Sequence, residues 1–357
     1  MLSDIQRDFL LNVARLADES RTSVLIVGGL IRDALLGQAL QDRDLDLVVE
    51  GNALPFARLC AQEMGARLTE FERFGTAKLT GPKNFPGIVE VDIASTRTET
   101  YTRPGALPEV LLVDSIRADL QRRDFTINCL AIRLPAFVES MREHNRQLLE
   151  ESSLDFFGGL NDLRSGTIRV LHARSFKDDP TRLYRACRYA ARLGARFDPL
   201  TQELFDSART ARDYESISIQ RRVNEFRRNF EEPHPAAALT ALCSSGLAES
   251  LPAAQPGRLT AELELLARFL TKLRAEQSYE VFLTLFFANW PEPELPALGF
   301  KRDKLKQLRH DADLLNNLPP SLSGLSPQLL MAALCNRSTR ERWSEIRSIL
   351  IAQGWLE

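Results

Sequence analysis

The sequence predicts an α+β domain of about 150 residues with a small, partly antiparallel sheet, followed by a region that is almost wholly helical. Two observations lead to this prediction. Over residues 4–132, segments with the period of amphipathic helices alternate with short apolar or alternating segments typical of strands. From about Asp179 onward the helical period dominates, and prolines separate the helices.

The elements of the first part follow one another along the chain. An amphipathic helix is predicted at residues 4–20, a strand ending on glycine at 23–29, a short helix ended by Gly37 at 30–37, a strand at 44–51, a helix at 53–64 and strands within 67–81 and 88–97. The stretch 97–115 is polar and contains Pro104, Gly105 and Pro108, so we expect a mobile loop there.

Length and composition favour a protein of two or three domains. The chain has 357 residues, of which 44% are hydrophobic and 26% charged, as in ordinary soluble proteins. No apolar run approaches the roughly 18 residues of a membrane span, and the acidic N-terminus does not resemble a signal peptide. We therefore expect a cytoplasmic protein with no membrane partner.

Charge is distributed unevenly. Residues 164–230 contain 15 Lys and Arg against 8 Asp and Glu, a charge of +7, and the rest of the chain carries −9. A basic region within a slightly acidic protein favours a polyanionic partner, although a solvated helical face would have the same composition. The sequence indicates no protein partner.

Other residues with chemical potential give weaker signals. The five cysteines are scattered and never spaced as C-x-x-C, so they predict small buried side chains rather than disulfides or a zinc site. His310 and Asp311 suggest a metal-dependent phosphohydrolase, but the chain has four histidines and no second histidine–aspartate cluster. A metal site needs several ligands, which argues against that reading.

Residues 26–51 carry the strongest chemical signal. Alternation along a strand places Asp44 and Asp46 on one face, with Leu45 and Leu47 toward the core. Neighbouring carboxylates repel each other unless a divalent cation lies between them. Gly28 and Gly29 precede a helix and allow a phosphate to approach the backbone closely. The combination predicts two-metal phosphoryl or nucleotidyl transfer.

Each half of this signal is common by itself. A lone D-x-D or a lone Gly-Gly also occurs at ordinary loops and strand ends. A dinucleotide-binding site is disfavoured, because the segment lacks the G-x-G-x-x-G spacing and Arg32 and Asp33 follow where small residues are needed.

A series of motifs then appears in order along residues 26–230: GG-x-x-RD-x-LLG, D-x-D-x-VVEG, RRDFTIN, FGG-x-x-DL-x-x-GTIRVLH and DDPTR-x-x-RA-x-RYAARLG. Together they resemble the class II tRNA nucleotidyltransferases and the bacterial poly(A) polymerases. The resemblance implies a polymerase-β-like nucleotidyltransferase head with a small mixed sheet, followed by an all-α neck, body and tail. On this basis we expect a catalytic head at 1–150, a neck with a nucleotide-selecting motif at 151–230 and a tRNA-binding body and tail at 231–357.

The resemblance also assigns roles to residues of the head. Asp44 and Asp46 would bind Mg²⁺, and Gly28, Gly29, Arg32 and Asp33 would shape the triphosphate site. Arg122, Arg123, Asp124 and Asn128 match the motif that implies ribose recognition. For a third catalytic carboxylate we favour Asp92, although Glu90 shares its strand face and both could belong to a solvated face.

In the neck, the resemblance assigns nucleotide selection to the DDPTR motif. Asp179 and Arg182 would offer an acceptor beside a donor, which complements adenine or cytosine but not guanine or uracil. Arg185 and Arg188 continue the spacing of three and could touch phosphates or RNA, unless the stripe is a solvated helix face. The family's usual Glu-Asp is here Asp178-Asp179, and the later helix motif is matched only in part, by Arg221 and Glu225.

The implied function is template-independent addition of nucleotides, either a terminal A or CCA, from ATP and CTP to the 3′ end of tRNA, with release of pyrophosphate. In the family that the sequence resembles, a shortened loop goes with CC-adding enzymes, so the long stretch at 97–115 disfavours that function. Its sequence YTRPGALPEV resembles A-adding members. A poly(A) polymerase acting on general RNA 3′ ends would share every head motif. A non-catalytic RNA-binding module would need the basic region, but not both Asp44 and Asp46.

Overall fold

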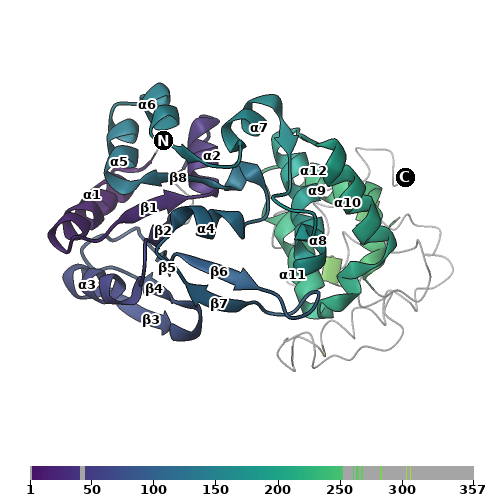
Figure 1. Cartoon of the computed structure of the whole chain (residues 1–357), viewed down its shortest axis with the longest axis horizontal. Coiled ribbons are helices and arrows are strands. Elements are labelled where there is room, and N and C mark those ends of the chain that lie inside the picture. Colours follow the sequence, from purple (N-terminus) through teal and green to yellow (C-terminus); the bar gives the residue numbers. More distant parts are fainter. Residues whose placement is uncertain are drawn as a thin grey trace, which may run out of the picture. The chain divides into compact units, whose positions relative to one another are not determined.

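The computed structural model describes residues 2–40 and 45–251, together with residues 260, 263, 264, 267, 282, 283, 303 and 306 of later helical turns (Figure 1). Contacts divide the chain into two compact units. Unit 1 comprises Met1–Ser175 and Arg196–Thr201, and unit 2 comprises Phe176–Ala195 and Gln202–Glu357. The predicted boundary at residue 150 falls inside unit 1, and the division into head, neck and body stays a prediction.

Strands and helices alternate in unit 1, and helices make up the described part of unit 2. The strands are β1 (Val24–Val27), β2 (Leu45–Val49), β3 (Arg67–Phe71), β4 (Thr76–Thr80), β5 (Glu90–Ser95), β6 (Arg97–Thr100), β7 (Glu109–Leu112), β8 (Leu130–Arg133), β9 (Leu154–Asp155), β10 (Thr167–Ile168) and β11 (Arg196–Phe197). The helices are α1 (Asp4–Glu19), α2 (Gly29–Leu35), α3 (Leu54–Met64), α4 (Ile116–Gln121), α5 (Leu134–Arg142), α6 (Arg146–Glu151), α7 (Gly159–Ser165), α8 (Ser175–Asp178), α9 (Thr181–Leu193), α10 (Pro199–Thr210), α11 (Ile219–Phe230) and α12 (Pro235–Ser244). The predicted α+β class is confirmed.

A seven-stranded mixed sheet forms the centre of unit 1. Its strand order is β3-β4-β5-β2-β1-β8-β9. Strands β2 and β5 are parallel, and the other neighbours in this sheet are antiparallel. Central strands such as β1 are buried along their whole length, which explains the continuous apolar run VLIV.

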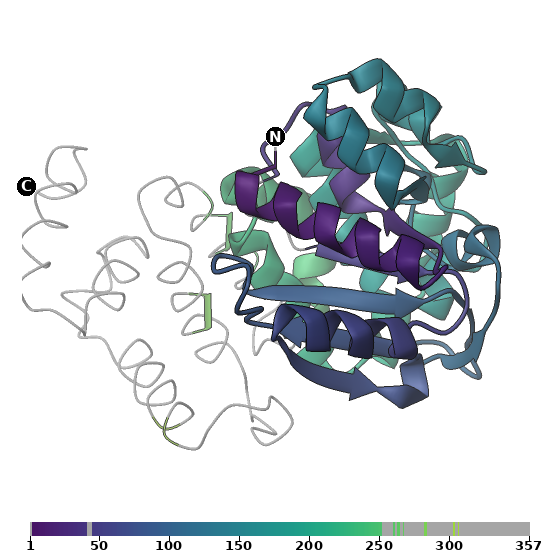
Figure 2. The same ribbon diagram turned by 90° about the vertical axis from the view of Figure 1, so that its left-hand side faces the viewer.

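The main core of unit 1 lies on one face of this sheet, where α1 and α3 lie next to each other (Figure 2). Helix α1 begins with a capping box between Ser3 and Gln6, which satisfies backbone N–H groups at its first turn. Its apolar side chains Phe9, Val13 and Leu16 recur at helical spacing and are buried against the sheet. Burial of each contributes about 1.5–3 kcal/mol, so α1 fixes this face as the interior.

The opposite face of the sheet is covered only in part. Leu25, Val27 and Val48 form a smaller core there with Ile116 and Leu120 of α4. Beyond that cluster, the same face of β2 and β5 carries exposed polar side chains. One face of the sheet is therefore structural, and the other is partly open.

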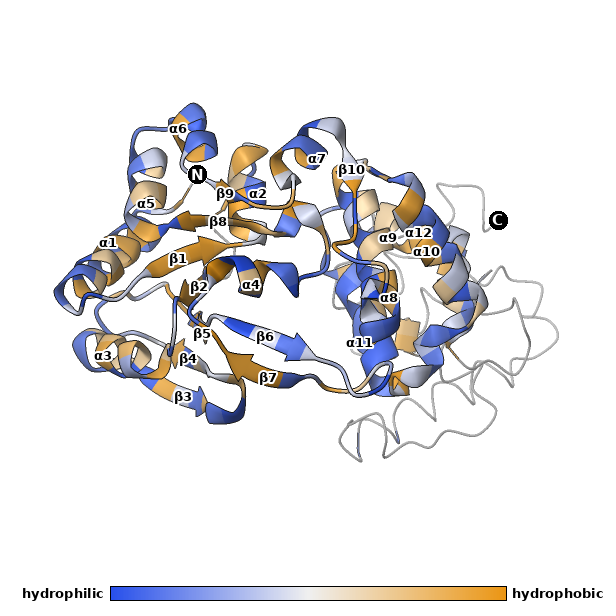
Figure 3. Ribbon diagram, viewed as in Figure 1, coloured by the Kyte–Doolittle hydropathy of each residue, from blue (hydrophilic) through white to orange (hydrophobic). Residues whose placement is uncertain are grey.

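The prediction of a loop over all of 97–115 is wrong at 97–100 and 109–112, which are strands. Strands β6 and β7 pair as an antiparallel hairpin, in the register Thr98↔Leu111. Figure 3 shows why the sequence misled, because β6 is hydrophilic and only β7 is apolar. Pro104, Gly105 and Pro108 lie in the turn between the strands, where proline and glycine are expected. We call residues 97–112 the hairpin.

Helices α9, α11 and α12 confirm the predicted helical segments of unit 2. Tyr184 of α9 is fully buried, and its hydroxyl donates to the Ser250 hydroxyl oxygen at 2.7 Å. The rings of Phe226 and Phe282 are stacked with their centroids 5.5 Å apart. An apolar core between α9 and α11 therefore holds unit 2 together.

The described cysteines Cys60, Cys129, Cys187 and Cys243 are all buried and free, as expected of small core side chains, and Cys335 lies outside the described residues. Across the described part of the chain, no helix combines the length and apolar character that crossing a membrane requires.

Candidate active site

The open face of the sheet carries the predicted acidic site. Asp46 is exposed on β2, and its neighbours Leu45 and Leu47 are buried, as the alternation predicts. Asp46 is the register partner of Asp92 on the parallel strand β5. Since neighbouring strands lie about 4.8 Å apart, the two carboxylates project from adjacent points on one face. Asp44 lies outside the described residues.

The neighbourhood of Asp92 contains a cation that sequence reasoning missed. Lys78 is the register partner of Asp92 on β4, and its Nζ lies 3.7 Å from the Asp92 carboxylate. It also pairs closely with Glu90, and this hydrogen bond is the largest cause that raises the pKa of Lys78. Glu90 and Asp92 thus share Lys78, with Glu90 the closer partner, and Asp92 lies between Lys78 and Asp46. Alternation along 76–80 could have placed Lys78 on this face.

Gly28 and Gly29 form a tight turn between β1 and α2. The Gly28 N–H donates to the Leu130 carbonyl at 2.9 Å, and Gly28 has φ +72°, which favours glycine. A Cβ atom at Gly28 would stand 3.2 Å from Nη1 of Arg123. The turn therefore depends on glycine both for its backbone conformation and for the close approach of an arginine.

Arg32, Asp33, Asp124 and Asn128 form a buried network behind this turn. The Arg32 guanidinium lies 2.7 Å from the Asp33 carboxylate and donates to the Asn128 Oδ1 at 2.5 Å. Asn128 in turn donates to Asp124 at 3.0 Å. The side chains of Arg32 and Asp33 are only 2% exposed, so both fix the turn from within. The structure brings together the four residues that the sequence assigned to two motifs.

Arg122 and Arg123 both contact Asp119 of α4. Arg122 lies 2.8 Å and Arg123 3.1 Å from its carboxylate oxygens. Burial tends to raise the pKa of Asp119, but the two guanidinium groups outweigh burial and hold the pKa below its usual value. Arg122 therefore donates hydrogen bonds to other residues of the protein. The role of Asp119 was not identified from the sequence.

In unit 2, Arg182 lies in the first turn of α9, and Asp179 precedes the helix, which begins at Thr181. Asp179 Oδ1 accepts hydrogen bonds from Arg221 at 2.9 Å and from the Thr181 hydroxyl at 2.8 Å. Arg182 is 4% exposed. Arg221 of the partly matched helix motif therefore orients the Asp179 carboxylate.

Arg185 and Arg188 do not form one exposed stripe. The Arg185 guanidinium lies 5.4 Å from the centroid of the Tyr189 ring and donates to its hydroxyl at 3.0 Å. Arg188 is buried, with Nη1 2.9 Å from Glu225 and Nε 3.4 Å from Glu232. The alternative of a solvated helix face is wrong for Arg188, which lies in an ion-pair network within unit 2.

The donor set at Asp46 and Asp92 suits a hard divalent cation. Carboxylate oxygens are preferred ligands of Mg²⁺, which commonly uses one or two of them together with substrate phosphates. Among the described residues, no group of three or more acidic, histidine or cysteine side chains could hold a metal.

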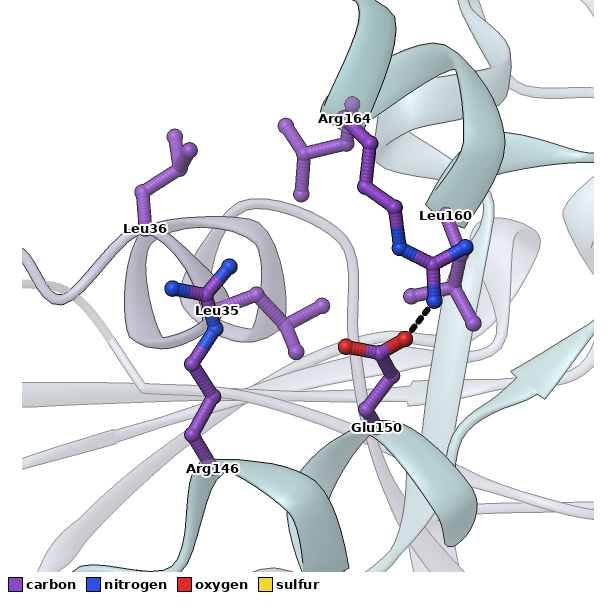
Figure 4. Close-up of a pocket in the computed structure, with 7 residues that line it drawn as sticks. Leu35, Leu36, Arg146, Glu150, Leu160 and Arg164 are labelled. Carbon is purple, nitrogen blue, oxygen red and sulfur yellow. Dashed lines mark ion pairs between the residues drawn. The ribbon is translucent and has the colours of Figure 1, made fainter.

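A separate cavity of about 260 Å³ lies in unit 1 between α2, α6 and α7 (Figure 4). Its walls include Leu35, Leu36 and Leu160, and an ion pair between Glu150 and Arg164 crosses it. None of the predicted site residues lines this cavity. His310 and Asp311 lie outside the described residues.

Comparisons with known proteins relate the chain to nucleotidyltransferases. Residues 24–169 match the family model described as poly A polymerase head domain. The chain is 38% identical over 238 residues to an A-adding tRNA nucleotidyltransferase of Geobacter sulfurreducens, covering 67% of this chain and 25% of the relative. It is 36% identical over 244 residues to an A-adding tRNA nucleotidyltransferase of Halalkalibacterium halodurans, covering 68% of this chain and 53% of the relative. The chain thus spans between a quarter and about half of the length of these two relatives.

Solved structures show the same fold. A CCA-adding enzyme in its apo form II aligns with a TM-score of 0.67 at 26% identity, covering 98% of this chain and 83% of the other. The Thermotoga maritima CCA-adding enzyme complexed with tRNA aligns with a TM-score of 0.63 at 27% identity, covering 96% of this chain and 81% of the other. Residues 24–169 thus resemble the poly A polymerase head domain, and the longer matches relate the chain to the A-adding tRNA nucleotidyltransferases.

Proposed function

We propose that this protein is a Mg²⁺-dependent nucleotidyltransferase that adds a terminal A, or CCA, from ATP and CTP to the 3′ end of tRNA in the cytoplasm, with release of pyrophosphate. The observation that carries the proposal is the pairing of Asp46 with Asp92 on the open face of the sheet. The relatives named A-adding tRNA nucleotidyltransferase supply the substrate and favour A addition.

The residues of unit 1 divide the work of the proposed reaction. Asp46 and Asp92 would hold the metal, together with Asp44. When bound, Mg²⁺ would lower the pKa of the RNA 3′-hydroxyl and neutralise charge on the departing pyrophosphate. The Gly28–Gly29 turn, which has no side chains, would let a phosphate approach the backbone closely, and Arg123 would supply positive charge beside it. Arg32 and Asp33 keep the turn in place from behind.

We assign base selection to Asp179 and Arg182. A carboxylate beside a guanidinium offers an acceptor and a donor, which matches the amino group and ring nitrogen of adenine or cytosine. Arg221 supports this role because its hydrogen bond holds Oδ1 of Asp179 and does not involve Oδ2. Residues 231–357 would bind the body of the tRNA, as their place in the family pattern suggests.

An extension assay with Mg²⁺ tests the proposal. Three tRNA transcripts, ending before CCA, after C and after CC, are each supplied with ATP and CTP separately and together. Extension of only the third transcript, by a single A, identifies an A-adding enzyme, and addition of C to the first identifies CC or CCA addition. Long A tails on unrelated RNA would favour a poly(A) polymerase, a function named for a relative that is 32% identical over 185 residues. If no transcript is extended, and wild type behaves like Asp46→Asn, the proposal fails.

A further inference from the structure

Asp119 is a fully buried carboxylate whose two oxygens serve different parts of unit 1. Its Oδ1 accepts from Arg122 Nε at 3.0 Å and Nη2 at 2.8 Å, and from the backbone N–H of Arg97 at 3.2 Å. Its Oδ2 accepts from Arg123 Nη2 at 3.1 Å. A single side chain on α4 therefore joins the first residue of the hairpin to both arginines of the RRDFTIN motif.

Arg123 connects this carboxylate to the glycine turn. Its Nη2 is held by Asp119, while its Nη1 lies 3.2 Å from the place where a Cβ atom at Gly28 would stand. Its Nε is buried without a hydrogen-bond partner among the described residues. Burial tends to lower the pKa of Arg123, but the charges of Asp119 and, more weakly, of Asp46 help to raise it. The guanidinium thus lies within the electrostatic reach of the metal-binding carboxylate.

Glu99 extends the network into the hairpin. Its Oε1 accepts from Arg97 Nη2 and from Arg122 Nη1, both at 2.9 Å, and its Oε2 accepts from the Tyr101 hydroxyl at 3.0 Å. The Glu99 side chain is 8% exposed. Charge-assisted hydrogen bonds between buried groups are strong and directional. A shift of β6 would therefore move Arg122 and, through Asp119, also Arg123.

We propose that Asp119 is a positioning residue of the nucleotide site, which holds Arg123 against the Gly28–Gly29 turn, and that Glu99 makes the hairpin part of the same support. The inference rests on the proposed function and extends it to residues that touch no substrate. Because Arg123 lies at the phosphate-approach turn, loss of this support should weaken nucleotide binding more than it changes RNA binding or the chemical step.

The test compares Asp119→Asn and Glu99→Gln with Glu109→Gln, an exposed glutamate on the other strand of the same hairpin. Both test variants keep side-chain shape and remove one charge. In extension assays with saturating RNA, we expect the KM for ATP to rise roughly tenfold or more, since each lost bond is charge-assisted. The kcat and the KM for RNA should each change less than about threefold, and Glu109→Gln should match wild type.

ATP affinity measured by equilibrium dialysis without RNA provides an independent readout. If wild type extends RNA but both test variants keep wild-type KM and ATP affinity, the inference is wrong while the proposed function stands. A fall in kcat with an unchanged KM for ATP would also overturn it. If wild type extends no RNA, the proposed function fails, and the ATP affinities still decide the inference. Thermal melting shows whether each variant folds. If Asp119→Asn does not fold, the KM and the ATP affinity of Glu99→Gln decide the test.

Discussion

Asp46 and Asp92 stand opposite each other on neighbouring parallel strands, both exposed, on the face of the sheet that α1 and α3 leave open. Two carboxylates at this spacing repel each other, and Lys78, 3.7 Å from Asp92, offsets part of that repulsion. A divalent cation between the two carboxylates would offset more of it. Chains rarely retain such an arrangement for stability alone.

Asp46→Asn and Asp92→Asn should each reduce extension activity by roughly a thousandfold or more, because each removes a charge that we propose binds the metal. Thermal stability should stay the same or rise in Asp46→Asn, since like-charge repulsion is removed, whereas Asp92→Asn also loses the ion pair with Lys78. Glu90→Gln is the matched control on the same strand face, and should retain activity within about tenfold of wild type. An active Asp92→Asn beside an inactive Glu90→Gln would make Glu90 the third carboxylate.

Asp179→Asn should reduce discrimination between ATP and GTP by about tenfold or more, because the amide offers a donor where the carboxylate offers only acceptors. The measurement is the ratio of kcat/KM values for the two nucleotides on the same transcript. Asp206→Asn, at an exposed position in α10, is the control and should leave the ratio unchanged. An unchanged ratio in Asp179→Asn would remove this residue from base selection.

Glu225→Gln should destabilise unit 2 by about 3 kcal/mol. It removes the carboxylate that lies 2.9 Å from the buried Arg188 and leaves only the more distant carboxylate of Glu232, at 3.4 Å, of the two. Urea denaturation measures the change in free energy of unfolding. Glu231→Gln is the control, because Glu231 pairs with Arg227 at the surface and should contribute less than about 1 kcal/mol. Equal stability of the two variants would show that the buried network contributes little.

Gly159→Ala should be strongly destabilising, by roughly 2–4 kcal/mol, because an added Cβ would stand 2.3 Å from the Thr126 carbonyl oxygen. Gly37→Ala is the contrast, with φ +70° and no atom within 4 Å of the added Cβ. It should cost about 1 kcal/mol for the backbone alone. Chemical denaturation of both variants compares steric and conformational costs directly.

Cys60, Cys187 and Cys243 should resist alkylation in the folded protein at pH 8.5. Burial raises the pKa of these thiols from 9.0 to about 12, 11 and 12, respectively, so the reactive thiolate is scarce. Iodoacetamide labelling followed by mass spectrometry should modify them only in denaturant.

The same shifts predict a pH dependence of stability. A pKa raised in the folded state gives stability that is complete below the unfolded thiol pKa of about 8.5 and is lost as pH rises toward the folded values. The free energy of unfolding should therefore fall above pH 8.5, and less steeply in a Cys187→Ala variant. A flat profile between pH 8 and 10.5 would contradict the assignment.

Local pattern was sufficient for those features that depend on one segment. The burial of Leu45 and Leu47 around Asp46 follows from alternation, and so does the shared face of Glu90 and Asp92. Alternation does not show which of Glu90 and Asp92 lies beside Asp46, because that depends on the register of β5 against β2. That register joins residues 46 positions apart in the chain.

The features missed from the sequence depend on partners far away in the chain. The segment 97–100 is polar and shows no strand pattern by itself. It forms a strand through its pairing with β7 and the ion pair between Glu99 and Arg122. Arg188 has the spacing of a ligand-contacting stripe, but Glu225 places it inside an ion-pair network. A charged side chain does not reveal from sequence whether its partner is a substrate or another residue.

The segment with Asp179 and Arg182 leaves unit 1 after Ser175, and the chain returns at Arg196 to add β11 beside β10 before leaving again after Thr201. Helix α9 is therefore part of an insertion into unit 1 rather than an appendage at its end. A fragment that stops at residue 175 would lack β11, and one that reaches residue 201 must include the helix.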